Sequence, residues 1–274
     1  MDVDESARRG SRATALLALH DRPGFVLPNA WDAGSARILE RLGFPAIATT
    51  SAGIAWACGV PDGGMLDPDI MLDRIESIAA AVEVPVTADL EAGYGATPEE
   101  VGRTVARAVD AGVVGANIED AVRGTLFDID DAVDRLAAAR AAAPHGRFVL
   151  NARTDTYFGG VQGDPFDETI ERAQRYVAAG ADCIFVPGVS DEETIRRLAA
   201  AIPVPLNLVA GLASHAIDVP TLFSLGVRRV SLGGSLARVA LTALERAAQD
   251  VLDSGSLDAV TDSIPYRGMQ ERFA

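Results

Sequence analysis

The chain has 274 residues, of which 49% are hydrophobic, and a formal net charge of −15. This length suits a single domain over residues 1–274, because a barrel of alternating strands and helices takes about 250 residues. The acidic balance argues against nucleic acid or an anionic membrane surface as a partner. No apolar run approaches the ~20 residues that a membrane helix requires.

The residue types also limit the chemistry. All 24 basic residues are arginine, and a Schiff-base aldolase requires a lysine amine, so that mechanism is excluded. Cys58 and Cys183 are too few for a disulfide framework and are typical of a reducing compartment. The first residues are acidic and polar, without the apolar segment of a signal peptide. We therefore predict a cytoplasmic protein.

Short β-type runs alternate with helical stretches along the chain. The predicted strands, in chain order, cover Phe25–Ala30, Ala46–Ala52, Val84–Leu90, Gly115–Glu119, Phe148–Arg153, Cys183–Val186, Leu206–Ala210 and Arg229–Leu232. The stretches between them are rich in Ala, Arg, Glu and Leu, and predict helices such as Pro98–Ala111, Ile129–Ala143 and Asp167–Ala179, before a long C-terminal helix at Ala237–Leu252. Eight β/α units in series predict an α/β fold, a (β/α)₈ TIM barrel with its site at the carboxyl ends of the strands. A doubly wound open sheet is the alternative, although no Gly-x-Gly-x-x-Gly opens the first helix.

Charged side chains gather where three successive strands end. Asp89 and Glu91 lie two residues apart and therefore on the same side of a strand, where a buried strand would normally carry Val or Ile. The next two strands end in Asn117-Ile-Glu119-Asp120 and Asn151-Ala-Arg153-Thr-Asp155. Carboxylates this close repel one another and need a cation or a shared proton between them. Acid, acid and arginine at adjacent strand ends predict a metal-dependent active site.

Four segments together resemble the isocitrate lyase and phosphoenolpyruvate mutase superfamily, including its carboxyvinyl-carboxyphosphonate phosphorylmutase-like members. The segments are Gly59-Val-Pro-Asp62, Asp89-Leu-Glu-Ala-Gly-Tyr-Gly95, Asn117-Ile-Glu-Asp120 and Asn151-Ala-Arg-Thr-Asp155. The resemblance runs from about Phe25 to Leu244, and the four segments in this order make it specific.

The resemblance implies a metal, usually Mg²⁺, among four carboxylates. Asp89 falls where the family has its direct metal ligand, and Asp62, Glu91 and Glu119 fall where family carboxylates hold the metal through waters. Many members carry Asp at the position of Glu91. A set of oxygen ligands also favours Mg²⁺ over Zn²⁺, with Mn²⁺ as an alternative.

The resemblance further implies how a substrate is held. Arg153 matches the family's arginine that grips a substrate carboxylate or phosphoryl group, as a planar guanidinium can. The alternative is a buried salt bridge to Asp155 or Glu119. The segment Thr50-Ser51-Ala52 resembles the one whose backbone N–H groups and hydroxyl hold the substrate carboxylate, and Asn207 resembles a substrate-facing asparagine.

The segment Ala121–Asp130 departs from the family pattern. The lyases carry Lys-[Lys/Arg]-Cys-Gly-His here, and the mutase and phosphonate hydrolases carry a lysine and an asparagine in their gating loop. This segment contains no Cys, Lys, His or Asn, and Arg123 and Thr125 are the candidates to replace those groups. Cleavage of isocitrate or methylisocitrate by the usual proton transfer is therefore not expected, and neither is rearrangement of a P–C bond.

These features predict a Mg²⁺-dependent lyase that acts on a small 2-oxo or 2-hydroxy carboxylate. The reaction would be C–C cleavage or decarboxylation through a pyruvate-enolate-like intermediate, with Asp62 or a water handling the proton. Two alternatives stay open, namely P–C chemistry of the phosphonopyruvate hydrolase or phosphoenolpyruvate mutase type, and a non-catalytic protein that binds a metal and an oxo acid.

The resemblance also implies a homo-oligomer, a tetramer built as a dimer of dimers. Family members exchange their C-terminal helix between neighbouring barrels, and Ala237–Leu252 is long and apolar on one side. The alternative is that this helix packs on its own barrel as the eighth helix.

Overall fold

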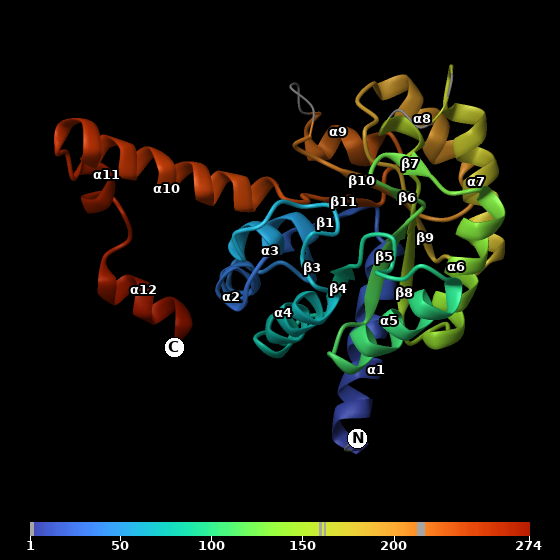
Figure 1. The fold of residues 1–274 in the computed structure, drawn as a ribbon, viewed down its shortest axis with the longest axis horizontal. Coiled ribbons are helices and arrows are strands. Elements are labelled where there is room, and N and C mark those ends of the chain that lie inside the picture. Colours follow the sequence, from blue (N-terminus) through green and yellow to red (C-terminus); the bar gives the residue numbers. More distant parts are fainter. Residues whose placement is uncertain (1–2, 159–160, 162, 213–216) are drawn as a thin grey trace.

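Parallel strands form a ring at the centre of the structure, a computed structural model that describes residues 3–158, 161, 163–212 and 217–274 (Figure 1). The strand order is β1-β11-β10-β9-β8-β5-β4-β3-β2, and every neighbouring pair in it is parallel. The two ends of this order, β1 and β2, are consecutive in the chain on either side of Pro28, which cannot donate a backbone hydrogen bond. The segment 25–30 thus pairs with β11 through its first half and with β3 through its second half, which brings the sheet round into a barrel.

The predicted (β/α)₈ TIM-barrel fold is confirmed, with helices between the strands on the outside of the ring (Figure 1). The strands are β1 Phe25–Leu27, β2 Asn29–Ala30, β3 Ile47–Thr49, β4 Val86–Asp89, β5 Gly115–Glu119, β6 Ala121–Val122, β7 Thr125–Leu126, β8 Val149–Arg153, β9 Cys183–Phe185, β10 Leu206–Val209 and β11 Arg229–Ser231. The helices are α1 Val3–His20, α2 Ala33–Arg41, α3 Ser51–Ala57, α4 Pro68–Ala80, α5 Pro98–Asp110, α6 Ile129–Ala142, α7 Phe166–Ala178, α8 Glu192–Ala201, α9 Val219–Ser224, α10 Ser235–Ser254, α11 Asp258–Thr261 and α12 Tyr266–Phe273, with a 3₁₀ turn at Thr156–Phe158.

One predicted strand is wrong at its carboxyl end. We expected Ala46–Ala52 to be extended, but β3 ends at Thr49 and Thr50 caps helix α3, with its hydroxyl accepting a hydrogen bond from the N–H of Gly53 at 3.3 Å. A threonine at this position satisfies one of the free N–H groups of the first helical turn. The segment Thr50-Ser51-Ala52 is therefore the start of a helix rather than the end of a strand, although it still lies at the carboxyl end of the barrel.

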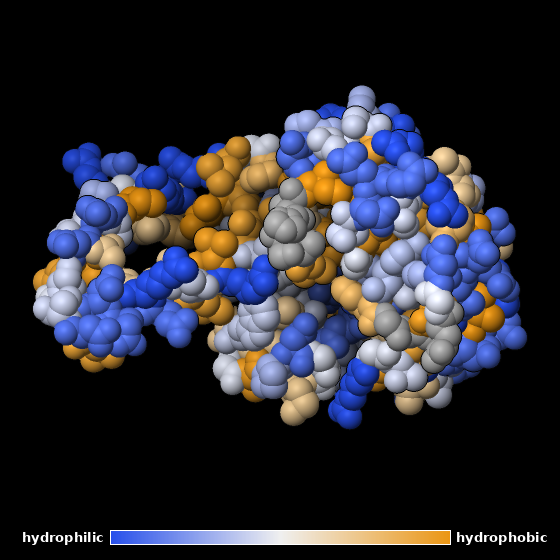
Figure 2. Space-filling view, turned by 90° about the horizontal axis from the view of Figure 1, so that it is seen from above, coloured by the Kyte–Doolittle hydropathy of each residue, from blue (hydrophilic) through white to orange (hydrophobic). Residues whose placement is uncertain are grey.

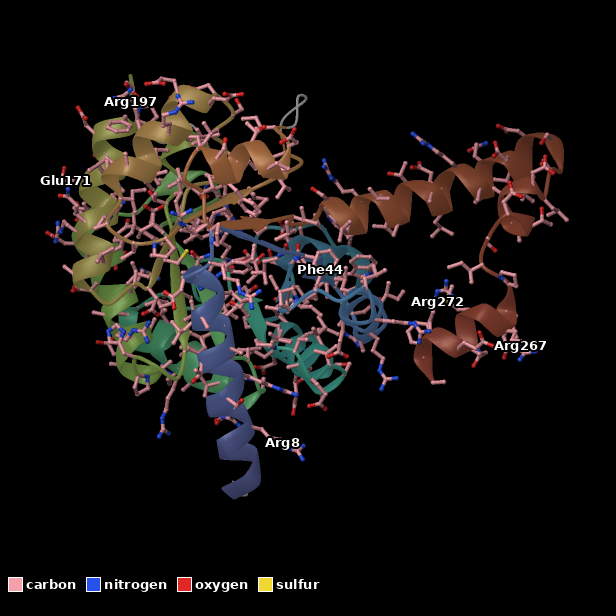
Figure 3. All side chains as sticks on the ribbon, turned by 180° about the vertical axis from the view of Figure 1, so that it is seen from behind. Arg8, Phe44, Glu171, Arg197, Arg267 and Arg272 are labelled. Atoms are coloured by element: carbon pink, nitrogen blue, oxygen red, sulfur yellow. The ribbon has the colours of Figure 1, made fainter. Side chains whose placement is uncertain are left out.

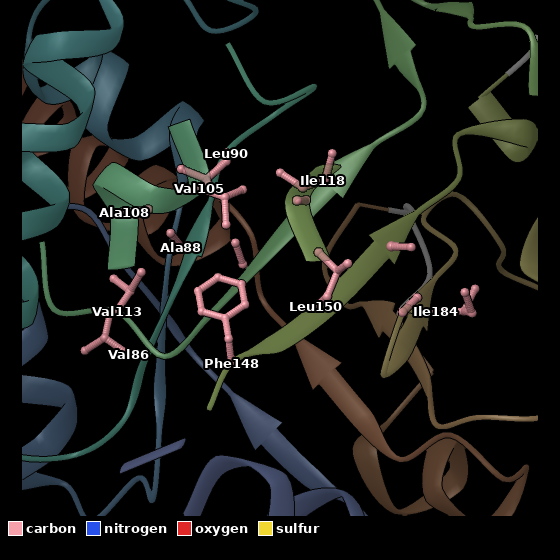
Figure 4. Packing of buried hydrophobic residues seen from close by; sticks show 14 of the residues in the cluster. Val86, Ala88, Leu90, Val105, Ala108, Val113, Ile118, Phe148, Leu150 and Ile184 are labelled. Carbon is pink, nitrogen blue, oxygen red and sulfur yellow. The ribbon is translucent and has the colours of Figure 1, made fainter. Parts of the chain in front are cut away.

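Two layers of apolar side chains hold the barrel together. Figure 4 shows the outer layer, in which Val105 and Ala108 of α5 meet residues of β4, β5 and β8 around Phe148. A separate cluster closes the amino end of the barrel, where Leu16 and Leu19 of α1 pack against the bases of the strands. Helix α1 thus covers the amino end of the barrel, opposite the carboxyl ends of the strands.

The C-terminal helices leave the barrel as an arm. Helix α10 projects away from the body of the molecule (Figure 1), and Ala237 is its buried residue. The chain then turns back, so that α12 contacts α2 through the side chains of Arg37 and Arg41, which donate to the carbonyls of Phe273 and Glu271. Figure 3 shows Arg267 and Arg272 on this returning helix. Within the described part of the chain, no helix combines the length and apolar character that crossing a membrane would require.

A buried polar network fixes the ends of β5 and β8 relative to each other. The carboxylate of Asp120, just after β5, accepts hydrogen bonds from Tyr176 at 2.7 Å and Arg172 at 3.2 Å, both on α7. It also accepts from the backbone N–H of Asp155, just after β8, at 2.9 Å. Asp120 is 3% exposed, so these donors replace water around its charge. The network holds in register the two strand ends that carry Glu119 and Arg153.

We predict that Tyr176→Phe lowers the free energy of unfolding by about 1.5–3 kcal/mol, the usual worth of a hydrogen bond to a charged group. The substitution removes only the hydroxyl that donates to Asp120. Denaturant unfolding measures the change, and Tyr266→Phe, at a side chain that is 80% exposed, is the matched control that should leave stability unchanged. Equal loss in both variants, or none in either, would show that the Asp120 network does not stabilise the barrel.

Candidate active site

The carboxyl ends of the strands surround a cavity of about 400 Å³. Of the residues predicted from the sequence, seven line it, namely Thr50, Ser51, Ala52, Asp62, Asp89, Arg153 and Asn207. Glu91 and Glu119, the other two predicted metal ligands, are not part of its lining but lie beside it, as their electrostatic coupling to Asp89 shows. The structure thus brings all nine residues to one end of the barrel.

Asp89 is the most firmly held carboxylate of the site. It ends β4, and its backbone N–H donates to the hydroxyl of Thr49 on the neighbouring strand at 2.9 Å. One of its carboxylate oxygens accepts from both the N–H and the hydroxyl of Ser51, each at 2.9 Å, and the other accepts from the amide of Asn117 at 2.8 Å. These neutral donors orient the carboxylate without cancelling its charge.

Two further acids crowd Asp89. Asp62 lies on an exposed loop with its carboxylate facing the cavity, and desolvation followed by the charge of Asp89 raises its pKa. Burial and the charges of Asp89 and Asp62 raise the pKa of Glu91 to about 7, although Tyr94 donates a hydrogen bond to it at 3.2 Å. The backbone of Glu91 has a φ of 48°, in the left-handed region that non-glycine residues rarely adopt. Such strain is found most often at functional sites.

Arg153 is ion-paired on both sides. Its guanidinium contacts Glu119 at 2.8 Å and forms two hydrogen bonds to Asp155, at 2.6 and 2.9 Å. Burial lowers the pKa of Arg153, but Glu119 and Asp155 raise it by more. Burial raises the pKa of Glu119 well above its usual range, and Asp155 and Asp89 add to this against the effect of Arg153. One guanidinium therefore does not neutralise all the acids around it.

The residues at this end of the barrel fit a hard divalent cation. Burial is the largest cause of the raised pKa of Asp62, Glu91 and Glu119, and the charges of neighbouring carboxylates add to it, which a bound cation would relieve. Among the described residues, no three or more His, Cys, Asp and Glu side chains come close enough to hold a metal directly. The donor set is thus oxygen only and sparse, which suits Mg²⁺, because that ion keeps several of its waters and binds through one or two carboxylates.

The segment over the site is a short hairpin. Strands β6 and β7 pair around a two-residue turn, Arg123-Gly124, in which both residues have positive φ angles of 51° and 76°. This is the pattern of a type I′ hairpin turn. Arg123 and Thr125 are exposed, and neither lines the cavity.

Several residues of the site carry no role in the sequence-based prediction. Asn117 orients Asp89. Asp155, by contrast, was expected as an alternative ion-pair partner of Arg153, and it forms that ion pair, as Glu119 also does. Trp56 and Arg229 line the cavity. The signal for Arg229 was available, because side chains alternate along a strand and one of two consecutive arginines at the start of β11 has to point into the barrel.

The parallel barrel makes this a (β/α)₈ protein. The cavity with its carboxylates lies at the carboxyl ends of the strands, which is the face where the active sites of this class of protein are found. The chain matches the phosphoenolpyruvate phosphomutase family over residues 16–252 and belongs to that family, within the isocitrate lyase and phosphoenolpyruvate mutase superfamily.

Three relatives show how this chain sits among proteins of the superfamily. The crystal structure of a candidate lyase/mutase from Burkholderia cenocepacia J2315 superposes with a TM-score of 0.92, at 42% identity over 98% of this chain and 97% of that one. The 2,3-dimethylmalate lyase of Eubacterium barkeri is 33% identical over 213 residues, 73% of this chain and 72% of the relative. A phosphonopyruvate hydrolase solved with oxalate and Mg²⁺ superposes with a TM-score of 0.85, at 25% identity over 95% of this chain and 94% of that one. The superfamily thus contains both C–C lyases and P–C enzymes.

We predict that Mg²⁺ binds more weakly as the pH falls below about 7, because Glu91 then keeps a proton that a nearby cation would have to displace. Because its pKa is raised, the metal-free carboxyl of Glu91 stays protonated up to a higher pH, so the affinity for Mg²⁺ falls as the pH falls. Calorimetric titrations at about pH 6 and about pH 8 should differ by up to roughly tenfold in Kd for each pH unit below the pKa.

The matched control for this prediction is Glu91→Gln, which cannot take up the proton. This variant should bind Mg²⁺ with an affinity that changes less between the two pH values. A wild-type affinity that is the same at both would mean that the acids of this site do not hold the cation.

Proposed function

We propose that this protein is a Mg²⁺-dependent lyase that acts on a small 2-oxo or 2-hydroxy carboxylate, by C–C cleavage or decarboxylation through a pyruvate-enolate-like intermediate. The observation that carries the proposal is the cavity itself, in which Asp62 and Asp89 face the same space as the donors of the α3 N-terminus and three arginine side chains. Such a space accommodates a small anion beside a cation.

Each predicted site residue has a role in this proposal. Asp89 would hold the cation, Mg²⁺ or in its place Mn²⁺, with Asp62, Glu91 and Glu119 reaching it through waters. When bound, a divalent cation supplies Lewis-acid stabilisation of negative charge that develops on substrate oxygens. Ser51 keeps Asp89 in place, since both its N–H and its hydroxyl donate to that carboxylate.

The remaining residues would hold the substrate and move its proton. Thr50 and Ala52 lie at the start of α3, where the N–H of Ala52 has no acceptor within the helix and favours an anion. The N–H of Thr50 donates to the carbonyl of Ala30 at 3.1 Å, so Thr50 would offer its hydroxyl. Arg153 would fix one anionic group from the side of β8, and Asn207 would face the substrate from β10. Asp62 would exchange the proton, and its raised pKa brings it closer to the range in which a carboxyl can act as an acid.

The hairpin favours a C–C reaction that requires little acid or base catalysis from side chains. Loss of CO₂ from a 2-oxo acid requires stabilisation of the enolate but no group that removes a proton from a hydroxyl. The exposed turn at Arg123-Gly124 offers no such group to the cavity. P–C chemistry, the activity named for the phosphonopyruvate hydrolase relative, is the second candidate, and binding without turnover is the third.

We predict that a screen of oxaloacetate, 2-methylisocitrate, 2,3-dimethylmalate and phosphonopyruvate will show Mg²⁺-stimulated decarboxylation of oxaloacetate. Methylisocitrate cleavage should be about 10²–10⁴-fold slower than in a lyase that carries the Cys-containing segment, because a general acid or base usually contributes a factor of that size. Arg153→Ala should reduce oxaloacetate turnover by weakening carboxylate capture, whereas Arg147→Ala, at an exposed arginine before β8, should not.

The opposite order of activities would reject the proposal. Efficient methylisocitrate cleavage, with oxaloacetate consumed no faster than free Mg²⁺ achieves, would mean that Arg123, Thr125 or a water replaces the missing acid. Turnover of phosphonopyruvate alone would favour the P–C alternative.

We also propose that the protein is a homo-oligomer, a dimer of dimers in which α10 packs on a neighbouring barrel. The support is the exposure of apolar side chains on this helix, where Val239 and Leu244 are each 66% exposed and Leu252 is 80% exposed. Figure 2 shows such side chains gathered where the arm leaves the barrel. Exposed apolar surface of this kind is more often part of a protein–protein interface than permanently exposed to solvent.

We predict that light scattering will give the mass of four chains of 28.6 kDa each. Leu244→Asp should lower that mass, because a charge on the contact face of α10 would have to be buried in the interface. Arg246→Ala, on the same helix, is the control. A wild-type species of single-chain mass at micromolar concentration would reject the oligomer.

A further inference from the structure

A second arginine of the cavity is buried without a counter-charge. Arg229, the first residue of β11, is 1% exposed and lines the same cavity as Asp89. Among the described residues it forms no ion pair, and its Nε and Nη1 atoms have no hydrogen-bond partner. A guanidinium remains charged in proteins, so its burial without an acid is costly.

The neighbouring strand presents an equally unpartnered amide at the same level. Asn207 of β10 is directly opposite Arg229 in the strand register, and it also lines the cavity. It is 1% exposed, and both its amide nitrogen and its amide oxygen have no hydrogen-bond partner. Adjacent strands lie about 4.8 Å apart, so the two side chains point at one place from neighbouring positions.

In the part of the chain that the structure describes, no side chain near Arg229 supplies a negative charge. Burial raises the pKa of the Cys183 thiol to about 12, so it is neutral near pH 7. Burial and the charge of Arg229 lower the pKa of His20 to about 4, so this imidazole is neutral as well. Asp182, which also acts on these two groups, is ion-paired to Arg140.

The three arginines that line the cavity therefore differ. Arg238 is exposed and donates to the carbonyl of Gly211 at 2.7 Å. Arg153 already contacts two carboxylates, Glu119 and Asp155. Arg229 contacts none among the described residues, so its charge is available to a ligand. Water could satisfy the hydrogen bonds of Arg229 and Asn207, but only an anion would also offset the charge.

We propose that Arg229 and Asn207 form a second anion-binding subsite on the cavity floor, and that it receives a carboxylate of the substrate. This inference rests on the proposed function and narrows it. The substrate would be a dicarboxylate, with its oxo or hydroxy acid end at the Asp89 wall and its distal carboxylate at Arg229. The cavity would then select substrates by their length and charge, because one end of the substrate would lie at the acidic wall and the other at the basic floor.

The test uses two Mg²⁺-dependent ligands of different length, measured by calorimetry on the full chain. Oxalate is too short to reach beyond a cation at the acidic wall, whereas malate carries a second carboxylate further along its chain. Arg229→Met should weaken malate binding by about 10- to 100-fold, as loss of a charge-assisted hydrogen bond does, and leave oxalate binding unchanged. Arg228→Met is the matched control, because it removes the same charge from a side chain that donates to the carbonyl of Pro23 at 2.8 Å, and both ligands should bind it as they bind the wild type.

A second variant keeps the charge of Arg229 and places a carboxylate of the protein itself in the subsite. Asn207→Asp places a carboxylate opposite Arg229 in the register, so it should also weaken malate and spare oxalate. Both variants should melt at or above the wild-type temperature without ligand, since Arg229→Met removes an uncompensated buried charge and Asn207→Asp pairs that charge with a carboxylate. This measurement guards against loss of affinity through unfolding.

The outcomes separate the two proposals. If oxalate binds with Mg²⁺ and malate binds the wild type and Arg229→Met equally, the subsite is wrong and the proposed function stands. If neither ligand binds the wild type with Mg²⁺, the proposed function is wrong and the subsite falls with it. If a free inorganic anion such as chloride displaces malate from the wild type but not from Arg229→Met, the subsite exists as proposed.

Discussion

Repulsion among carboxylates at the ends of β4 and β5 is the constraint on which the rest of the site depends. A parallel barrel brings its strand ends together, so acids at those ends cannot move apart without unwinding the sheet. Asp89, Glu91 and Glu119 are gathered in this way, and Asp62 joins them from the loop between α3 and α4. Burial, and after it the charges of the neighbouring acids, raises the pKa of Asp62, Glu91 and Glu119. A cation at this position would convert that repulsion into binding energy.

The scaffold opposes the repulsion with neutral donors and remote ion pairs. Ser51 and Asn117 hold Asp89 from two sides, and Asp120 ties the ends of β5 and β8 to helix α7. These groups fix geometry without supplying a positive charge to the cavity wall. The guanidinium that does lie there, Arg153, is shared between Glu119 and Asp155. The charge left over is negative at the wall and, through Arg229, positive at the floor.

Local signals in the sequence were sufficient for the barrel and for most of the site. Strand β5 has the predicted bounds, and α5 and α6 differ from prediction by one residue, because glycine caps, proline starts and apolar periodicity are local. The end of β3 was wrong because the β-branched residues Ile47, Thr49 and Thr50 favour a strand, whereas Thr50 caps α3 by accepting a hydrogen bond from the N–H of Gly53. Helix α1 was not predicted, although Ala13, Leu16 and Leu19 recur at helical spacing. The sequence offered Asp155 and Glu119 as alternative partners of Arg153, and both contact it. The isolation of Arg229 follows from the closure of the ring, which no local pattern encodes.

The central claim is that the acidic wall of the cavity holds a divalent cation at Asp89. Anomalous diffraction from crystals soaked in Mn²⁺, which binds the same oxygen ligands as Mg²⁺, tests it most directly. A single strong peak beside the carboxylate of Asp89, lost in Asp89→Asn crystals, is the predicted result. A map in which the manganese lies elsewhere in the barrel, or in which the peak survives that substitution, would contradict the account.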